Sequence, residues 1–256
     1  MTFLEEVLEV KREEITRLRQ SPPAILSAGP RGFGRFLRRK EISIIAEIKR
    51  RSPSKGDLAR SLDVAETAQA YAAGDAAAIS CLTDRRFFGA EAGDFGQALC
   101  ADLPVLRKDF LIDEIQIDES AAMGAAAILL IVRILPEGRL EELLRYAASR
   151  GLEALVEIHD ESEIDRALQS GATMIGVNNR DLATLEIDPG RAARLRALIP
   201  AGVLTVAESG VKTREDVKRI EDAGFDATLI GEALITNPDP AAMLMQLAGK
   251  TMAVLR

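Results

Sequence analysis

Residues 73–82 read AGDAAAISCL, in which a glycine and small residues lead into an apolar run. Three later segments repeat this order: MGAAAILLIV (123–132), SGATMIGVNN (170–179) and AGFDATLIGE (223–232). Further apolar runs lie between them, in PVLRKDF (104–110), LEALVEI (152–158) and VLTVAES (203–209). The repeating unit is therefore about 25 residues long, which suits one strand plus one helix.

The segments between the apolar runs have the period of amphipathic helices. LDVAETAQAYAA (62–73) places apolar residues at i, i+4 and i+7 and is followed by Gly74, a helix C-cap signal. Similar patterns predict helices within residues 137–150, 160–169 and 213–223. Helices thus alternate with the apolar runs along the chain.

Eight strands are predicted, near residues 44–49, 76–82, 104–108, 126–131, 153–158, 173–178, 203–208 and 227–231. Their nearly continuous apolar character is typical of strands buried on both faces, and the strict alternation with helices predicts a parallel sheet. We therefore predict an α/β fold, a single-domain (β/α)8 TIM barrel. An open doubly wound sheet is the alternative, but SPSKG after the first strand is not the glycine-rich turn such sheets carry.

Residues 1–43 precede the first predicted strand. They contain an amphipathic helix, LEEVLEVKREEITRLRQ (4–20), and a second, basic helix around 31–39. We expect residues 1–43 to form a helical extension packed on a barrel made of residues 44–256.

The composition excludes several classes of protein. The net charge of −7 argues against a nucleic-acid partner. No apolar stretch approaches the roughly 20 residues of a membrane span, and no signal peptide is evident, so we expect a cytoplasmic protein without a membrane partner. Cys81 and Cys100 are expected to fill the core, and His159, the single histidine, to be a loop residue. One histidine and two cysteines make a transition-metal site improbable.

Charged and small polar residues gather at the carboxyl ends of the predicted strands, where barrel enzymes carry their reactive groups. They are Glu47 and Lys49 after the first strand, Lys108 and Asp109 after the third, Glu157 after the fifth, Asn178 and Arg180 after the sixth, and Glu208, Ser209 and Gly210 after the seventh. Glu47 and Lys49 are two residues apart and therefore share one face of an otherwise apolar strand. This pattern predicts a catalytic site at one end of the barrel.

The last two strands suggest a phosphate site. AESGV follows the seventh strand and LIGEAL the eighth, so Ser209, Gly210 and Gly231 offer backbone N–H groups at the usual phosphate-binding loops of this fold. Glu232 would contribute only its N–H, because its carboxylate would repel a phosphate. The lysines suit proton transfer on a phosphorylated organic substrate, with Lys108 as general acid or as a Schiff-base nucleophile.

Motifs along nearly the whole chain resemble one family. IIAEIKRRSPSKG, ISCLTDRRFFGA, VLRKDFLIDEIQI, LVEIHDE, IGVNNRDLATLEID, VAESGV and LIGEALI together resemble indole-3-glycerol phosphate synthases of tryptophan biosynthesis. The resemblance implies a carboxy-lyase that closes 1-(2-carboxyphenylamino)-1-deoxyribulose 5-phosphate to indole-3-glycerol phosphate, losing CO₂ and water. It also implies that no cofactor or metal is used. We expect a cytoplasmic monomer or weak homo-oligomer that binds only this small phosphorylated molecule.

The resemblance also implies roles for individual residues. Lys108 matches the general acid, Glu157 a carboxylate beside the arylamine, and Lys49 a lysine for phosphate binding and dehydration. Glu47 and Asn178 match residues that orient these groups. Further substrate contacts are implied for Ser52, Phe110, Arg180, Leu182, Glu208 and Ser209, and phosphate contacts for Lys49, Ser209, Gly210, Gly231 and Glu232. The SPSKG loop is expected to close over the site.

Some positions depart from the family pattern, namely Asp75, Ala90, Glu91 and Ile115. All lie outside the expected catalytic set. Three other functions remain open: a Schiff-base lyase at Lys108, an isomerase acting on a related sugar arylamine through Cys81 and a partner acid, and a barrel that binds without catalysis.

Overall fold

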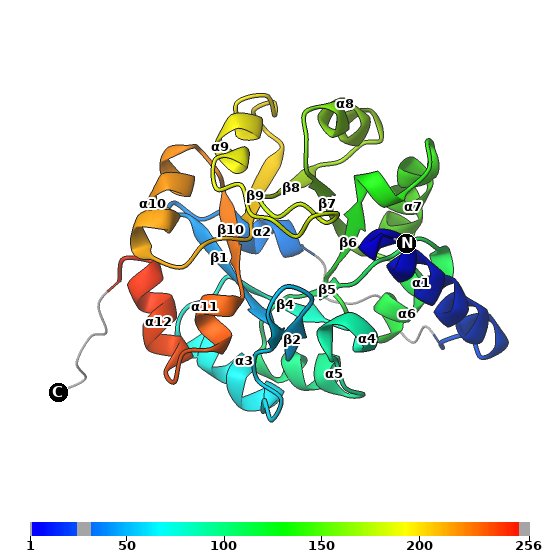
Figure 1. The fold of residues 1–256 in the computed structure, drawn as a ribbon, viewed down its shortest axis with the longest axis horizontal. Helices are drawn as coiled ribbons and strands as arrows, with labels where there is room; N and C mark the ends of the chain where they lie inside the picture. Colours follow the sequence, from blue (N-terminus) through cyan, green and yellow to red (C-terminus); the bar gives the residue numbers. More distant parts are fainter. Residues whose placement is uncertain (1, 25–31, 251–256) are drawn as a thin grey trace.

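A computed structural model describes residues 2–24 and 32–250, and its centre is a closed ring of eight parallel strands (Figure 1). The strands are β1 (Ser43–Ile48), β4 (Ala78–Leu82), β5 (Val105–Lys108), β6 (Ala127–Ile131), β7 (Glu153–Ile158), β8 (Met174–Asn178), β9 (Leu204–Glu208) and β10 (Ala227–Ile230). The ring closes where β1 pairs with both β4 and β10. The predicted barrel and its eight strands are confirmed, and the open sheet is wrong.

Helices surround the ring of strands on the outside (Figure 1). The longer ones are α3 (Val64–Ala73), α6 (Glu114–Ala122), α7 (Arg139–Ser149), α8 (Ser162–Gln169), α10 (Arg214–Asp222) and α12 (Pro240–Leu247). Shorter helices are α4 (Arg85–Phe88), α5 (Asp94–Ala98), η1 (Leu99–Ala101), η2 (Val132–Ile134), α9 (Arg191–Arg196) and α11 (Glu232–Ile235). After β1, the short strands β2 (Arg51–Ser52) and β3 (Gly56–Asp57) pair antiparallel. The helices predicted at 62–73, 137–150, 160–169 and 213–223 correspond to α3, α7, α8 and α10.

The turn after α3 differs from the other repeats. Gly124, Gly171 and Gly224 have positive φ angles, whereas Gly74 has a φ of −81° and Asp75 takes the left-handed conformation instead. Gly74 is needed for a different reason, because a Cβ there would lie 2.9 Å from the carbonyl oxygen of Ala241. The glycine thus lets α12 approach α3 closely.

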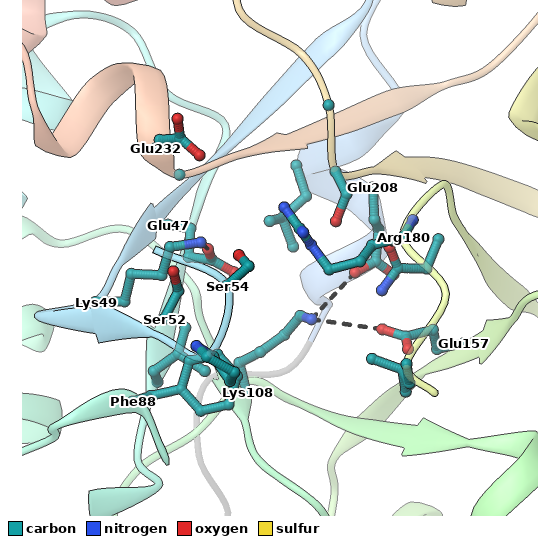
Figure 2. Close-up of a pocket in the computed structure, with 18 of the residues that line it drawn as sticks. Glu47, Lys49, Ser52, Ser54, Phe88, Lys108, Glu157, Arg180, Glu208 and Glu232 are labelled. Atoms are coloured by element: carbon teal, nitrogen blue, oxygen red, sulfur yellow. Dashed lines mark hydrogen bonds and ion pairs between the residues drawn. The ribbon is translucent and has the colours of Figure 1, made fainter. Parts of the chain in front are cut away.

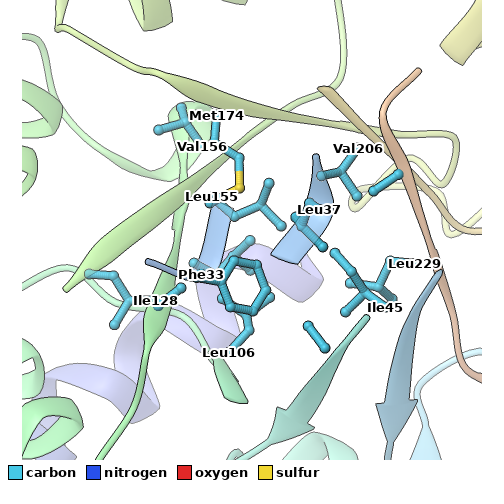
Figure 3. Packing of buried hydrophobic residues seen from close by; sticks show 14 of the residues in the cluster. Phe33, Leu37, Ile45, Leu106, Ile128, Leu155, Val156, Met174, Val206 and Leu229 are labelled. Carbon is cyan, nitrogen blue, oxygen red and sulfur yellow. The ribbon is translucent and has the colours of Figure 1, made fainter. Parts of the chain in front are cut away.

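The two ends of the barrel differ in chemistry. At the carboxyl ends of the strands, polar side chains surround a cavity (Figure 2). At the opposite end, α2 (Phe33–Leu37) inserts its buried side chains Phe33 and Leu37 among Ile45, Leu106 and other barrel residues (Figure 3). The Gly34 N–H donates to Glu153 at the start of β7, 2.9 Å away. The helix predicted around 31–39 is confirmed, but it is shorter and covers only Phe33–Leu37. Residue 31 lies outside the described residues.

The other helix of the N-terminal segment, α1 (Phe3–Gln20), packs on the barrel beside α6. Its Lys11 is 1% exposed and forms ion pairs with Asp84, at 2.6 Å, and with Asp109, at 2.8 Å. Burial alone would lower the pKa of Lys11, but the carboxylates of Asp109 and Asp84 outweigh burial and raise it. Lys11 thus fastens α1 to the loops that follow β4 and β5. The division of the chain at residues 43 and 44 remains a prediction.

Two further expectations concern residues outside the site. Cys81 is buried in β4, as expected, but Cys100 is exposed, so its prediction as a core residue is wrong. Cys100 lies in the short helix η1 on the outer layer, which the apolar pattern did not resolve. Among the helices of residues 2–24 and 32–250, none is long and apolar enough to span a membrane.

Replacing Lys11 with Met should lower the free energy of unfolding by about 3–5 kcal/mol, because buried Asp84 then loses its cation and buried Asp109 keeps only Arg107, at 3.3 Å. Chemical denaturation of the purified variant measures this change. The matched control is Arg12→Ala on the exposed face of the same helix, with an expected effect within about 0.5 kcal/mol. Equal stabilities for the two variants would contradict the role given to Lys11.

Candidate active site

Every residue that the sequence singled out as catalytic or binding lines the cavity at the carboxyl ends of the strands. They are Glu47, Lys49, Ser52, Lys108, Phe110, Glu157, Asn178, Arg180, Leu182, Glu208, Ser209, Gly210, Gly231 and Glu232. They come from six strands and the loops after them, because parallel strands in a closed ring end at one rim. The cavity brings the whole predicted set together; the roles of its members are proposals treated below.

Lys108, the last residue of β5, occupies the centre of the cavity (Figure 2). Its ammonium lies 3.4 Å from Glu157 of β7 and 3.2 Å from Glu208 of β9. Burial alone would lower the pKa of Lys108, but the nearby carboxylates, Glu208 foremost, outweigh burial and raise it. Lys108 is therefore a protonated acid at neutral pH.

The two carboxylates beside Lys108 differ in their acidity although both are 1% exposed. Burial raises the pKa of Glu208 above its usual range, and Lys108 opposes this only in part. Burial acts on Glu157 in the same direction, but Lys108 and His159 outweigh it and lower the pKa of Glu157. Glu157 is consequently the ionised partner, and Glu208 can hold a proton near neutral pH.

Glu47 and Lys49 form a second ion pair on β1 and the residue after it. Their side chains point into the cavity, as their spacing predicts, with Nζ of Lys49 2.5 Å from Oε1 of Glu47. Gly231 makes this pair possible, because a Cβ at Gly231 would lie 2.4 Å from the same Oε1. The end of β10 therefore leaves room for charged groups of β1.

Gly176 has the same function on β8. A Cβ at this position would lie 2.1 Å from Oε1 of Glu208 and 3.3 Å from Leu155. Gly176 sits in the middle of a fully buried strand, where glycine weakens the backbone and gives no side chain to pack. Its presence there is explained by the space that the Glu208 carboxylate needs.

The loop after β8 forms one wall of the cavity. The Asn178 Oδ1 accepts a hydrogen bond from the N–H of Arg180, at 2.9 Å, and the Arg180 guanidinium donates to the carbonyl of Leu185, at 2.8 Å. Leu182, Leu185 and Ile187 give this wall an apolar surface. The loop thus places the Arg180 guanidinium among apolar side chains at the edge of the cavity.

The rim beside β9 and β10 is richer in cations than the sequence analysis recognised. Glu232 faces Lys55 at 3.2 Å and Lys212 at 3.6 Å, and these two lysines lower its pKa together with Lys49, against the effect of burial. We missed Lys55 and Lys212, although they lie within the SPSKG and AESGVK segments. The negative charge of Glu232 is therefore balanced by neighbouring cations.

Aromatic rings form the side of the cavity opposite that rim. Phe88 of α4 lies 6.3 Å from Phe110, measured between ring centroids, and Phe3 of α1 lies 6.4 Å from Phe110. Of these three rings, only Phe110 is a substrate contact predicted from the sequence. Phe88 could have been found from the FFGA motif, whereas Phe3 reaches the cavity through the docking of α1, which no local pattern reveals.

His159 lies in the loop after β7, as predicted, but its side chain is fully buried between Glu157 and Glu163. The prediction treated position alone and could not see that α8 covers this loop. Cys81 does not line the cavity, and burial raises the pKa of its thiol to about 12, which disfavours the isomerase alternative.

Replacing Gly176 with Ala should lower the free energy of unfolding by about 1–3 kcal/mol, because the new methyl group displaces a buried carboxylate from its ion pair. Chemical denaturation measures the change. Gly96→Ala is the control: Gly96 lies in α5 with no atom within 4 Å of a new Cβ. That helix should gain about 0.5–1 kcal/mol. A Gly176→Ala protein as stable as the parent would contradict the close packing described here.

Solved structures with a similar fold include two enzymes. 3-Hexulose-6-phosphate synthase superposes with a TM-score of 0.64 at 18% identity, over 81% of this chain and 99% of that chain. Thiamine phosphate pyrophosphorylase from Pyrococcus furiosus gives a TM-score of 0.61 at 15% identity, over 83% of this chain and 96% of that chain. At these identities the comparisons support the fold alone.

Sequence comparisons are more specific. The family model described as indole-3-glycerol phosphate synthase matches residues 4–247. The indole-3-glycerol phosphate synthase of Chlorobium phaeovibrioides is 48% identical, over 91% of this chain and 95% of its own length. The enzyme of the same name from Parafrankia sp. is 46% identical, over 96% and 95%. The chain therefore belongs to the indole-3-glycerol phosphate synthase family.

Proposed function

We propose that the cavity converts 1-(2-carboxyphenylamino)-1-deoxyribulose 5-phosphate to indole-3-glycerol phosphate, CO₂ and water, a step of tryptophan biosynthesis. The ring carbon that carries the carboxylate bonds to the ketone carbon of the sugar, and the carboxylate leaves as CO₂. The former ketone oxygen then leaves as water, with a proton lost from the neighbouring carbon. The equation balances without an oxidant or reductant.

The observation that carries this proposal is the Lys108 ammonium, held at the centre of the cavity by Glu157 and Glu208. Attack on the ketone puts negative charge on its oxygen, and a buried N⁺–H group aimed at that oxygen stabilises this charge and supplies the proton. The raised pKa of Lys108 keeps it protonated before the reaction. A Schiff-base lyase would need the neutral amine, which the surrounding carboxylates disfavour.

Glu157 and Lys49 serve the other proton transfers. Glu157 is ionised and lies beside Lys108, so it can stabilise the positive charge that develops on the arylamine nitrogen. Lys49 lies on the opposite side of the cavity with Glu47, where it can assist departure of water and contact the phosphate. Asn178 and Glu47 orient these groups.

The phosphate is assigned to the rim formed by the loops after β9 and β10. Backbone N–H groups of Ser209, Gly210 and Gly231 are available there, and Ser209 and Gly210 both have positive φ angles. Lys49, Lys55 and Lys212 surround the rim. Glu232, also at this rim, would contribute its N–H while its carboxylate stays with Lys55 and Lys212.

The apolar end of the substrate faces the aromatic wall. Phe110, Phe88 and Leu182 can pack on the carboxyphenyl ring, while Ser52 and Arg180 offer polar contacts within the same cavity. The distance between this wall and the phosphate rim orients the substrate, with its ketone near Lys108. Glu208 and Ser209 complete the contacts from β9.

We further propose that the protein acts in the cytoplasm as a monomer or weak homo-oligomer and has no nucleic-acid or membrane partner. Its net charge of −7 supports the absence of a nucleic-acid partner.

Lys108→Met should lower kcat by roughly 10²- to 10⁴-fold, because the general acid is lost. Lys108→Arg should be almost as inactive, since a guanidinium keeps the charge but does not release a proton. Indole fluorescence of the product measures turnover, because the chain contains no tryptophan. A Lys108→Arg variant with parental kcat would contradict general-acid catalysis, and a parent protein without any product would contradict the proposed reaction.

Lys49→Met should lower kcat/KM by about 10- to 100-fold, the loss expected for a hydrogen bond to a charged group. Both KM and kcat should change, because Lys49 is assigned to the phosphate and to the dehydration. Lys218→Met, which removes the same charge from the exposed face of α10, should leave both constants unchanged. An effect of Lys49→Met on stability alone would refute this assignment.

A further inference from the structure

His159 is the chain's single histidine and lies outside the cavity, directly behind Glu157. The side chain is 0% exposed. Its Nε2 lies 3.3 Å from Oε1 of Glu157, and its Nδ1 lies 3.7 Å from the Glu163 carboxylate. Among the described residues, neither ring nitrogen has a hydrogen-bond partner of good geometry, so its contacts with Glu157 and Glu163 are ion pairs. The imidazole thus faces two carboxylates.

Glu163 is itself held in place. It accepts hydrogen bonds from the backbone N–H of His159, at 2.6 Å, and from Nε of Arg133, at 3.0 Å. Arg133 also forms ion pairs with Asp160, at 3.2 Å, and with Asp181, at 3.4 Å. The charged groups around the imidazole are therefore Glu157 from β7, Glu163 from α8 and, beyond Glu163, Arg133 from η2.

Glu157 and Glu208 provide a comparison within the same site. Both carboxylates are buried equally and both face the Lys108 ammonium. Glu157 also faces the His159 imidazole, whereas within residues 2–24 and 32–250 Glu208 has no ion-pair partner besides Lys108. One carboxylate oxygen of Glu157 faces Lys108, and the other faces His159. Burial raises the pKa of both carboxylates, but Lys108 and His159 together lower the pKa of Glu157. Burial and the negative charges of Glu157 and Glu47 raise the pKa of Glu208, and Lys108 opposes them only in part.

We propose that His159 is a positioning residue whose imidazolium keeps Glu157 ionised and aimed at Lys108 during turnover. This inference rests on the proposed function of Glu157. It acts through Glu157, because the cavity wall separates His159 from the substrate.

The need for a second cation follows from the reaction itself. When Lys108 gives its proton to the ketone oxygen, the positive charge beside Glu157 disappears. A buried carboxylate without a counter-charge takes up a proton readily. The imidazolium on the far side of Glu157 does not contact the substrate and therefore keeps its charge throughout.

The sign of the pH effect can be worked out from the neighbours. Burial would lower the pKa of His159, but Glu157 and Glu163 outweigh burial and raise it to about 9. The imidazolium and the stability it contributes are present below the unfolded-state pKa of about 6.5 and are lost as the pH rises through about 9. Removing this cation raises the pKa of Glu157, so activity should fall earlier on the acid side.

The first test reads the charge of His159 directly and needs no turnover. With ¹³C- and ¹⁵N-labelled histidine, the single imidazole gives one set of NMR signals. We expect it to titrate near pH 9 in the parent protein and at lower pH in Glu157→Gln and Glu163→Gln. Asp165→Asn, which removes a carboxylate from the exposed face of α8, is the control and should leave the titration unchanged. Titration near the ordinary pKa of about 6.5 in the parent would overturn the proposal.

The second test measures kcat from pH 3 to pH 9 for the parent and for His159→Asn, which cannot carry a charge. The acid limb should move up by about one to three pH units while KM changes little. Glu163→Gln should move it in the same direction by less, and this variant decides the matter if His159→Asn does not fold. Parallel pH profiles would overturn the proposal even if the parent makes product, whereas a parent without product would refute the function but leave the NMR result valid.

Discussion

The ion pairs of Lys108 with Glu157 and Glu208 depend on closure of the barrel. In the ring, β5 and β9 are separated by β6, β7 and β8. A flat sheet with the same order would place β5 and β9 about 19 Å apart, since neighbouring strands lie about 4.8 Å apart. The Lys108 ammonium is nevertheless 3.2 Å from Glu208. Only a closed ring, with all strand ends pointing to one axis, lets three distant segments share a buried proton donor.

The same geometry explains why so much of the site could be predicted from the sequence. Strand ends are marked locally, by apolar runs that stop at a charged residue, and parallel order then places all of these ends at one rim. Lys49, Lys108, Glu157 and Asn178 could be assigned to one site from chain order alone. The strands could be predicted from the regular spacing of the apolar runs alone. Their parallel pairing could be predicted because helices alternate with them.

What the sequence could not reveal depends on contacts between elements that no period encodes. Lys11 lies in the charged run KREE, which is typical of a solvent-exposed helix face. The sequence around it does not indicate that Asp84 and Asp109 are buried opposite it. The burial of the loop residue His159 could not be predicted, because it depends on α8 folding back over β7. Phe3 reaches the cavity only because α1 docks on the barrel.

The apolar core and the charged groups of the proposed active site lie at opposite ends of the barrel. At the amino-terminal end, α2 fills the barrel with Phe33 and Leu37, so this end supplies apolar burial (Figure 3). At the other end, Gly176 and Gly231 have no side chains, and this leaves the space that the carboxylates of Glu208 and Glu47 occupy. Each buried charge there costs several kcal/mol unless it is paired. The filled end offsets the cost that remains after pairing, and this allows a cavity lined by buried ion pairs at the other end.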